Sequence, residues 1–194
     1  APSQGQEWLA RLSYQPQKSL LASVQMKQER KMRNEATEEA AAPTYTLVPI
    51  LKNQVQANLE LGVSPELSFQ SRILWNQVIL DQSKSQGWML LQDISFKREK
   101  WKLTARMALF DTETFDNRLY AYEHNALGAF AIPAFSGKGS RQYLLVQYRV
   151  HPKLTAYLRI AQTIYADREV ISSGMQEIAG PKQTDTVLVL RYAL

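Results

Sequence analysis

The feature that most constrains the fold of this chain is a repeated alternation of polar and apolar residues. Between Gln54 and Leu61 every second residue is polar, and the residues between them are apolar. Successive side chains of a β-strand point to opposite faces, so this pattern gives one polar and one apolar face. Similar segments of roughly ten residues recur along the chain between turn residues, and helical periodicity is almost absent. The sequence therefore predicts an all-β protein built of antiparallel hairpins.

The connections between these segments fall into two classes that alternate along the chain. Tight turns are predicted at about residues 15–18, 62–66, 97–100 and 150–153. Longer excursions run over about 28–52, which is rich in charge and reads as a solvated loop, and about 111–140. The second is rich in aromatic residues, so we expect it to continue its hairpin beyond the membrane or to fold back across the barrel mouth.

This asymmetry is typical of transmembrane barrels, which have short periplasmic turns and long extracellular loops. It predicts an up-and-down transmembrane β-barrel of the outer-membrane type with about nine or ten strands. Residues 1–194 form a single barrel domain or the C-terminal portion of one. With the first turn in the periplasm, the first strand descends, whereas barrels normally begin with an ascending strand. We therefore expect residues before Ala1 and a larger barrel.

Hydropathy excludes only a helical membrane protein. The mean hydropathy of −0.33 is that of a water-soluble protein, and no stretch reaches the roughly 18 apolar residues of a membrane-spanning helix. A barrel strand meets lipid only with every second residue, so the average does not exclude a barrel. Aromatic residues favour the membrane barrel, because they gather on the apolar faces, mostly at strand ends, as interfacial girdles do. The predicted girdle consists of Trp8, Tyr14, Trp75, Trp88, Phe96, Trp101, Tyr148 and Tyr192.

The opposite faces carry long polar side chains at positions within the strands. A wet or salt-bridged lumen accommodates such residues, whereas on a soluble β-protein they would form the exterior. The predicted lumen-lining residues are Arg11, Gln56, Glu60, Arg72, Asp93, Arg106, Gln147, Arg149, Arg159 and Arg191. The net charge of +5 favours contact with anionic groups. The expected partners are outer-membrane lipid, lipopolysaccharide and other outer-membrane proteins.

The last strand resembles the terminal signal by which bacterial barrels are recognised for membrane insertion. The residues that carry this likeness are Leu188, Leu190, Tyr192 and Leu194. The signal normally ends in phenylalanine or tryptophan, and Leu194 departs from it.

A second resemblance rests on five short motifs in the C-terminal half. They are Phe110–Thr112, Asp116–Glu123, Pro133–Gly139, Arg141–Leu145 and Ile164–Arg168, the last continuing through Gly174. Together they resemble the C-terminal part of Bacteroidota outer-membrane proteins that carry helix-hairpin-helix repeats ahead of a β-barrel. This resemblance implies an outer-membrane barrel with no established catalytic residues. The helix-hairpin-helix region, which implies DNA contact in that family, has no counterpart in this chain, so nucleic-acid binding is not carried over.

Few residues favour catalysis or metal binding. The chain has no cysteine, and its two histidines, His124 and His151, do not form a cluster that could hold a transition metal. An outer-membrane hydrolase using His124 within Glu123–Asn125 is the enzymatic alternative. The carboxylates of Glu60 and Asp93 could face one another, but nearby arginines favour a structural ion-pair network. We expect no cofactor, no metal and no enzymatic activity.

The sequence thus predicts a bacterial outer-membrane protein with a structural, anchoring or transport role for solutes or macromolecules. Two alternatives remain open. One is an interaction subunit of an outer-membrane complex that binds partners through residues 28–52 and 111–140. The other is a soluble periplasmic β-barrel binding protein.

Overall fold

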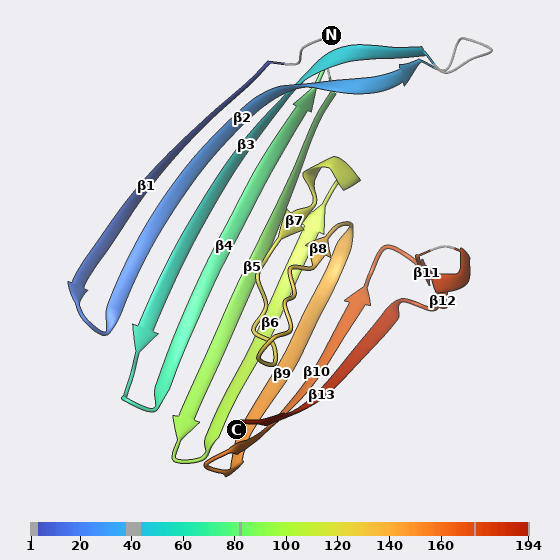
Figure 1. Ribbon diagram of the computed structural model, residues 1–194. Helices are drawn as coiled ribbons and strands as arrows, with labels where there is room; N and C mark the ends of the chain where they lie inside the picture. Colours follow the sequence, from blue (N-terminus) through green and yellow to red (C-terminus); the bar gives the residue numbers. More distant parts are fainter. Residues whose placement is uncertain (1–3, 38–43, 82, 173, 194) are drawn as a thin grey trace.

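A computed structural model describes residues 4–37, 44–81, 83–172 and 174–193. They form one curved sheet of nine strands, in the order β1-β2-β3-β4-β5-β6-β9-β10-β13, and each strand is antiparallel to its neighbours (Figure 1). The predicted up-and-down fold and strand number are confirmed. The strands are β1 (Gly5–Gln17), β2 (Leu20–Thr37), β3 (Thr44–Gly62), β4 (Leu67–Leu80), β5 (Ser83–Arg98), β6 (Trp101–Thr112), β9 (Lys138–His151), β10 (Leu154–Tyr165) and β13 (Lys182–Tyr192).

Two connections carry short elements of their own. Between β6 and β9 lie the 3-10 helix η1 (Phe115–Asn117) and the two-stranded pair β7 (Leu119–Tyr120) and β8 (Ala134–Phe135). Between β10 and β13 lie β11 (Val170–Ile171), η2 (Gly174–Gln176) and β12 (Ile178–Ala179). Within the described ranges, no helix is long and apolar enough to cross a membrane.

The predicted tight turns are confirmed, but the predicted loop over residues 28–52 is wrong. Residues 28–37 and 44–52 belong to β2 and β3, which pair without interruption from Leu20↔Leu61 to Thr37↔Thr44. This part of β2 was not predicted because Glu29–Arg33 places polar residues on both faces of the strand. The alternation of polar and apolar residues that indicates a strand is therefore absent. The second excursion is shorter than predicted, since Asp111 and Thr112 end β6 and β9 begins at Lys138.

The strand register gives the sheet two distinct faces. The partners Arg11↔Gln25, Gln25↔Gln56 and Gln56↔Leu74 lie on one face, and the same face continues through Leu74↔Met89. We call this the inner face, because the β6–β9 connection packs against it, and we call that connection, residues 113–137, the insert. The opposite face is the outer face. The sheet curves around the insert (Figure 1).

The register also sets the tilt of the strands. Following the paired residues from strand to strand, we start at Leu20, the first residue of β2, and arrive at Ile160, six positions after the first residue of β10. Both strands begin at a tight turn, so the pairing shifts by six residues, or about 20 Å along the strands, over six strand spacings of about 29 Å in total. That ratio gives a tilt of about 35°, within the range of transmembrane barrels.

The sheet has two edges, β1 and β13, and these are not paired with one another in the described residues. All thirteen residues of β1 are exposed. Because neighbouring strands alternate in direction, the first and ninth strands run the same way. The described strands therefore form an open part of a barrel.

Candidate functional site

The insert lies on the inner face as an extended segment with alternating side chains. Leu119, Ala121 and Glu123 are buried towards the sheet, while Tyr120 and Tyr122 are exposed. Of the two predicted arrangements for this region, the segment folds back, but it lies along the inner face rather than across the barrel mouth as predicted. The start of the insert is fixed by Asn76 of β4, whose side-chain Nδ2 donates to the carbonyl oxygen of Asn117 at 2.8 Å.

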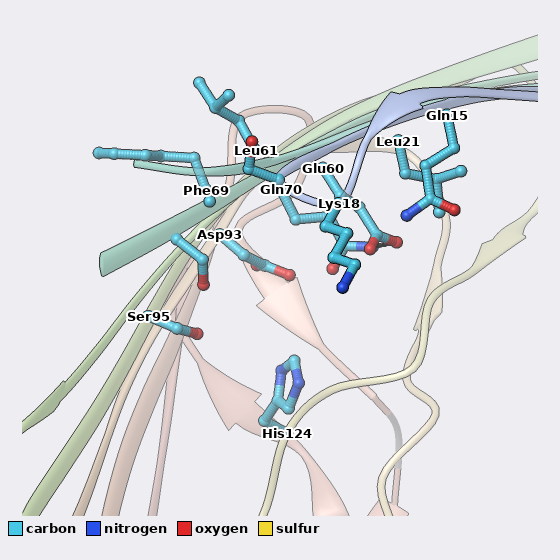
Figure 2. A pocket seen from close by; sticks show the side chains of 13 residues that line it. Gln15, Lys18, Leu21, Glu60, Leu61, Phe69, Gln70, Asp93, Ser95 and His124 are labelled. Atoms are coloured by element: carbon cyan, nitrogen blue, oxygen red, sulfur yellow. Dashed lines mark hydrogen bonds between the residues drawn. The ribbon is translucent and has the colours of Figure 1, made fainter. Parts of the chain in front are cut away.

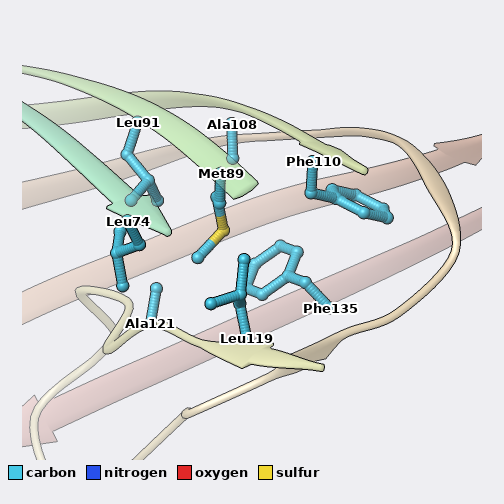
Figure 3. Close-up of a cluster of buried hydrophobic side chains, with 8 residues drawn as sticks. All are labelled: Leu74, Met89, Leu91, Ala108, Phe110, Leu119, Ala121 and Phe135. Carbon is cyan, nitrogen blue, oxygen red and sulfur yellow. The ribbon is translucent and has the colours of Figure 1, made fainter. Parts of the chain in front are cut away.

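An apolar cluster joins the insert to the inner face (Figure 3). The sheet contributes Leu74, Met89, Leu91, Ala108 and Phe110, and the insert contributes Leu119, Ala121 and Phe135. The rings of Phe110 and Phe135 meet edge to face with centroids 5.2 Å apart. Burial of Leu119 and Phe135 stabilises the docked insert by about 2 kcal/mol each.

Next to this cluster, a buried carboxylate holds the insert by charge. Glu123 has no solvent exposure. Its Oε1 and Oε2 accept hydrogen bonds from Arg141 of β9 at 2.7 and 3.1 Å, and Oε2 also accepts one from Arg159 of β10. Arg141 contacts Thr163 and Asp185 as well, at 2.7 and 3.4 Å. The insert therefore carries the counter-charge of two arginines of the barrel wall.

A second arginine site lies beside the Glu123 site on the inner face. Arg106 donates two hydrogen bonds of 2.5 Å to the carboxylate of Asp93 and a third to the backbone oxygen of Tyr122 in the insert. The ring of Tyr143 lies between Arg106 and Arg159, whose guanidinium carbons are 5.5 and 5.0 Å from the ring centroid. The backbone N–H of His124 donates to the Tyr143 hydroxyl at 3.2 Å. These groups bind the insert at successive residues.

The ion-pair network predicted around Glu60 and Asp93 exists only in part. Asp93 pairs with Arg106, but Glu60 accepts a hydrogen bond from Gln70, and Arg72 donates to Asn58 instead. Glu60, Asp93 and His124 nevertheless line one hollow of about 330 Å³, shown in Figure 2.

His124 is half-buried in the insert. Burial lowers the pKa of its imidazole below the ordinary value. Its Nδ1 lies 3.2 Å from the Tyr143 hydroxyl, and no serine or carboxylate oxygen of the described residues is within hydrogen-bond distance of the ring. The described residues also hold no group of three or more histidine, cysteine or acidic side chains that could bind a metal ion.

All ten predicted lumen-lining residues lie on the inner face by strand register. They differ in surroundings: Asp93, Arg106 and Arg159 are buried, whereas Arg11, Arg149 and Arg191 are exposed near the edges and turns. Sequence reasoning missed Glu123, Arg141 and Tyr143, which hold the insert. The alternation of Leu119, Ala121 and Glu123 was the available signal, because it marks an extended segment with one buried face.

All eight predicted girdle residues lie on the outer face, at two levels. Trp101 and Tyr148 stack beside a tight turn with centroids 4.2 Å apart, and Tyr14, Phe96 and Tyr192 lie at the same end of their strands. Trp8, Trp75 and Trp88 form the other level. Trp88 and Phe96 are eight positions apart on β5, about 22 Å along a barrel axis at 35° tilt, close to the ~25 Å apolar band of outer-membrane barrels.

The residues of the predicted insertion signal lie on the last strand. Leu188, Leu190 and Tyr192 are exposed on the outer face of β13, and Leu194 lies outside the described residues.

No protein-family model matches the chain, and no curated protein matches it. Among solved structures, the chain is similar to the NanC porin with 10% identity and a TM-score of 0.44, over 98% of this chain and 94% of that chain. It is also similar to the copper transporter OprC with 12% identity and a TM-score of 0.51, over 96% of this chain and 35% of that chain. At this identity the likeness to OprC bears on the fold alone. The fold is that of an antiparallel β-barrel of the outer-membrane type.

Proposed function

We propose that this chain forms part of an outer-membrane β-barrel that lines a passage for small polar solutes, with the insert narrowing that passage. The observation that carries the proposal is the separation of the two faces over nine strands. On the outer face of β5, for example, Leu90 and Ile94 are exposed between Trp88 and Phe96. On the inner face, β2 and β3 present Gln25, Lys27, Gln54 and Gln56 at matched positions.

This distribution suits a sheet between lipid and water. Exposed leucine and isoleucine side chains on a water-facing surface of this size would favour aggregation, whereas lipid accommodates them. Glutamine and lysine on the inner face need water or hydrogen-bond partners. An outer-membrane location places each face in the solvent that it requires, and the basic residues outside the band would then meet lipopolysaccharide phosphates.

A filled anchor without a passage is the second candidate. Its support is the insert, which is docked on the inner face by the Glu123 and Arg106 contacts and by the apolar cluster. A lumen that the insert fills completely would give no conductance.

Reconstitution distinguishes these candidates. The full-length protein is extracted from outer membranes with detergent, its folded state is checked by heat-modifiable gel mobility, and it is inserted into planar lipid bilayers. Stepwise conductance supports the passage. Folded protein without conductance supports the anchor, and recovery in the soluble fraction without detergent overturns both.

A further inference from the structure

Three hollows follow one another between the insert and the wall formed by β2, β3 and β4. Their lining residues on β3 include Lys52 for the first, Gln54 and Gln56 for the second, and Glu60 for the third. Their volumes are about 470, 290 and 330 Å³. The insert lines them in the same order, with Arg118, then Tyr120, then His124. The hollows are therefore stacked along the strands, from the long-connection end to the tight-turn end.

The first hollow has more positive charge than its own acids neutralise. Its two carboxylates already have partners, because Glu29 pairs with Lys31 at 2.8 Å and Asp116 pairs with Arg33 at 2.6 Å. The other two cations are Lys52 and Arg118, and no carboxylate of the described residues lies within 4.0 Å of either.

Arg118 is held in place by neutral groups. Its guanidinium lies 4.3 Å from the ring centroid of Phe115, and its nitrogens donate to the Tyr120 hydroxyl at 2.5 Å and to the Phe115 carbonyl oxygen at 3.0 Å. These contacts fix the position of the charge without neutralising it. A fixed cation is preorganised to meet a mobile anion.

Below the first hollow, one further cation without an acid partner lies on the wall. The second hollow is lined by the amides of Gln25, Gln54 and Gln56, by apolar and aromatic residues, and by Lys27, which pairs with Glu7 at 2.9 Å. Arg72, the partner of Asn58 between the second and third hollows, donates to the Asn58 oxygen at 2.7 Å and pairs with no acid of the described residues. In the third hollow, Asp93 is neutralised by Arg106, which leaves Glu60 facing Lys18 (Figure 2).

We propose that these three hollows form the route of the solute and that the route takes anions, namely small molecules bearing carboxylate or phosphate groups. Lys52, Arg72 and Arg118 are the residues that select them. Fixed charges at close quarters in a narrow passage raise the local concentration of ions of opposite sign. This inference rests on the proposed passage. It specifies in addition that the solute is an anion and that it moves between the insert and the wall of β2, β3 and β4.

The test is the reversal potential of the full-length protein in a planar bilayer with a KCl gradient. The expected chloride-to-potassium permeability ratio is above one. A unit charge about 4 Å from an ion in water changes its occupancy about five-fold, so the triple variant Lys52→Gln, Arg72→Gln, Arg118→Gln should lower the ratio by about that factor or more. The charge-conserving triple Lys52→Arg, Arg72→Lys, Arg118→Lys should keep it. Lys84→Gln, on the exposed outer face of β5, is the matched control and should leave the ratio unchanged.

Each outcome decides a different point. Conductance with no anion preference, or with a preference that the neutral triple leaves unchanged, overturns the anion route and leaves the passage standing. Folded protein with no conductance overturns the passage and the route together. Should the neutral triple fail to fold, the three single variants carry the test, each with a partial fall in the ratio.

Discussion

Replacing Glu123 by glutamine should release the insert from the barrel wall. The carboxylate has no exposure and neutralises Arg141 and Arg159, which are also buried. Glutamine keeps the shape of the side chain and one acceptor oxygen, but it leaves the buried Arg159 without a counter-charge and Arg141 with Asp185 alone, 3.4 Å away. Removal of one partner from a buried ion pair typically costs about 3–5 kcal/mol.

The cost falls on the docking of the insert rather than on the sheet. Apolar contacts also hold the insert: Leu119, Ala121 and Phe135 contribute about 5 kcal/mol, and the wall residues that they cover contribute further. A loss of about 3–5 kcal/mol therefore weakens the docking of the insert, while the hydrogen-bonded strands keep their own contacts. A loss of about 3 kcal/mol raises the population of the released insert by about two orders of magnitude.

Limited proteolysis of the folded protein in membranes measures this population. Trypsin should cleave Glu123→Gln after Arg118 about a hundred-fold faster than the wild type, with the barrel still heat-modifiable on gels. Glu66→Gln is the matched control: its half-exposed carboxylate lies 3.9 Å from Arg98, and such a surface pair contributes under about 1 kcal/mol. Equal cleavage rates for wild type and Glu123→Gln would refute the assignment of Glu123 as the charge that holds the insert.

Two further predictions follow from the outer face and from His124. Ile94→Arg, on the outer face between Trp88 and Phe96, should lower the free energy of unfolding in lipid by up to about 4 kcal/mol, whereas Gln86→Arg, beyond Trp88 towards the start of β5, should cost under about 1 kcal/mol. Equal costs in urea titrations of the two variants would contradict the proposed position of the sheet in the membrane. Because burial lowers the pKa of His124, the insert should be most stable above about pH 6.5 and lose stability as the pH falls through the lowered pKa. Trypsin cleavage of the insert should therefore rise on mild acidification in the wild type, and a pH-independent rate in the wild type would contradict it.

The sheet was largely predictable from the sequence because its two faces meet different solvents. The alternation at Gln54–Leu61 predicted a strand with two distinct faces, and aromatic residues such as Trp88 and Phe96 lie on the outer face as predicted. The extension of β2 to Thr37 and of β3 from Thr44 was not predictable in this way. Outside lipid neither face of the hairpin needs to be apolar, and Glu29–Arg33 therefore reads as loop although it pairs fully with β3.

The insert illustrates a different limit. The length and aromatic content of residues 111–140 indicated a segment that avoids water, but not which wall it would contact. That choice depends on Glu123 meeting Arg141 and Arg159, which are 18 and 36 residues away in the sequence. No local pattern encodes a pairing over such a separation, and the arginines alone are equally compatible with an open lumen.

The alternation of polar and apolar residues is interrupted in β5, and this interruption explains why the insert packs there. It also bears on the position of the proposed passage. Trp88–Leu91 is continuously apolar, so Met89 and Leu91 place apolar side chains on the inner face beside the usual apolar outer face. A strand that is apolar on both faces needs cover on both. The insert supplies that cover, and moving it would expose Met89, Leu91 and Phe110 to water at about 2 kcal/mol each. Because β2 and β3 carry glutamine and lysine on their inner face and need no such cover, the proposed passage lies on their side of the insert.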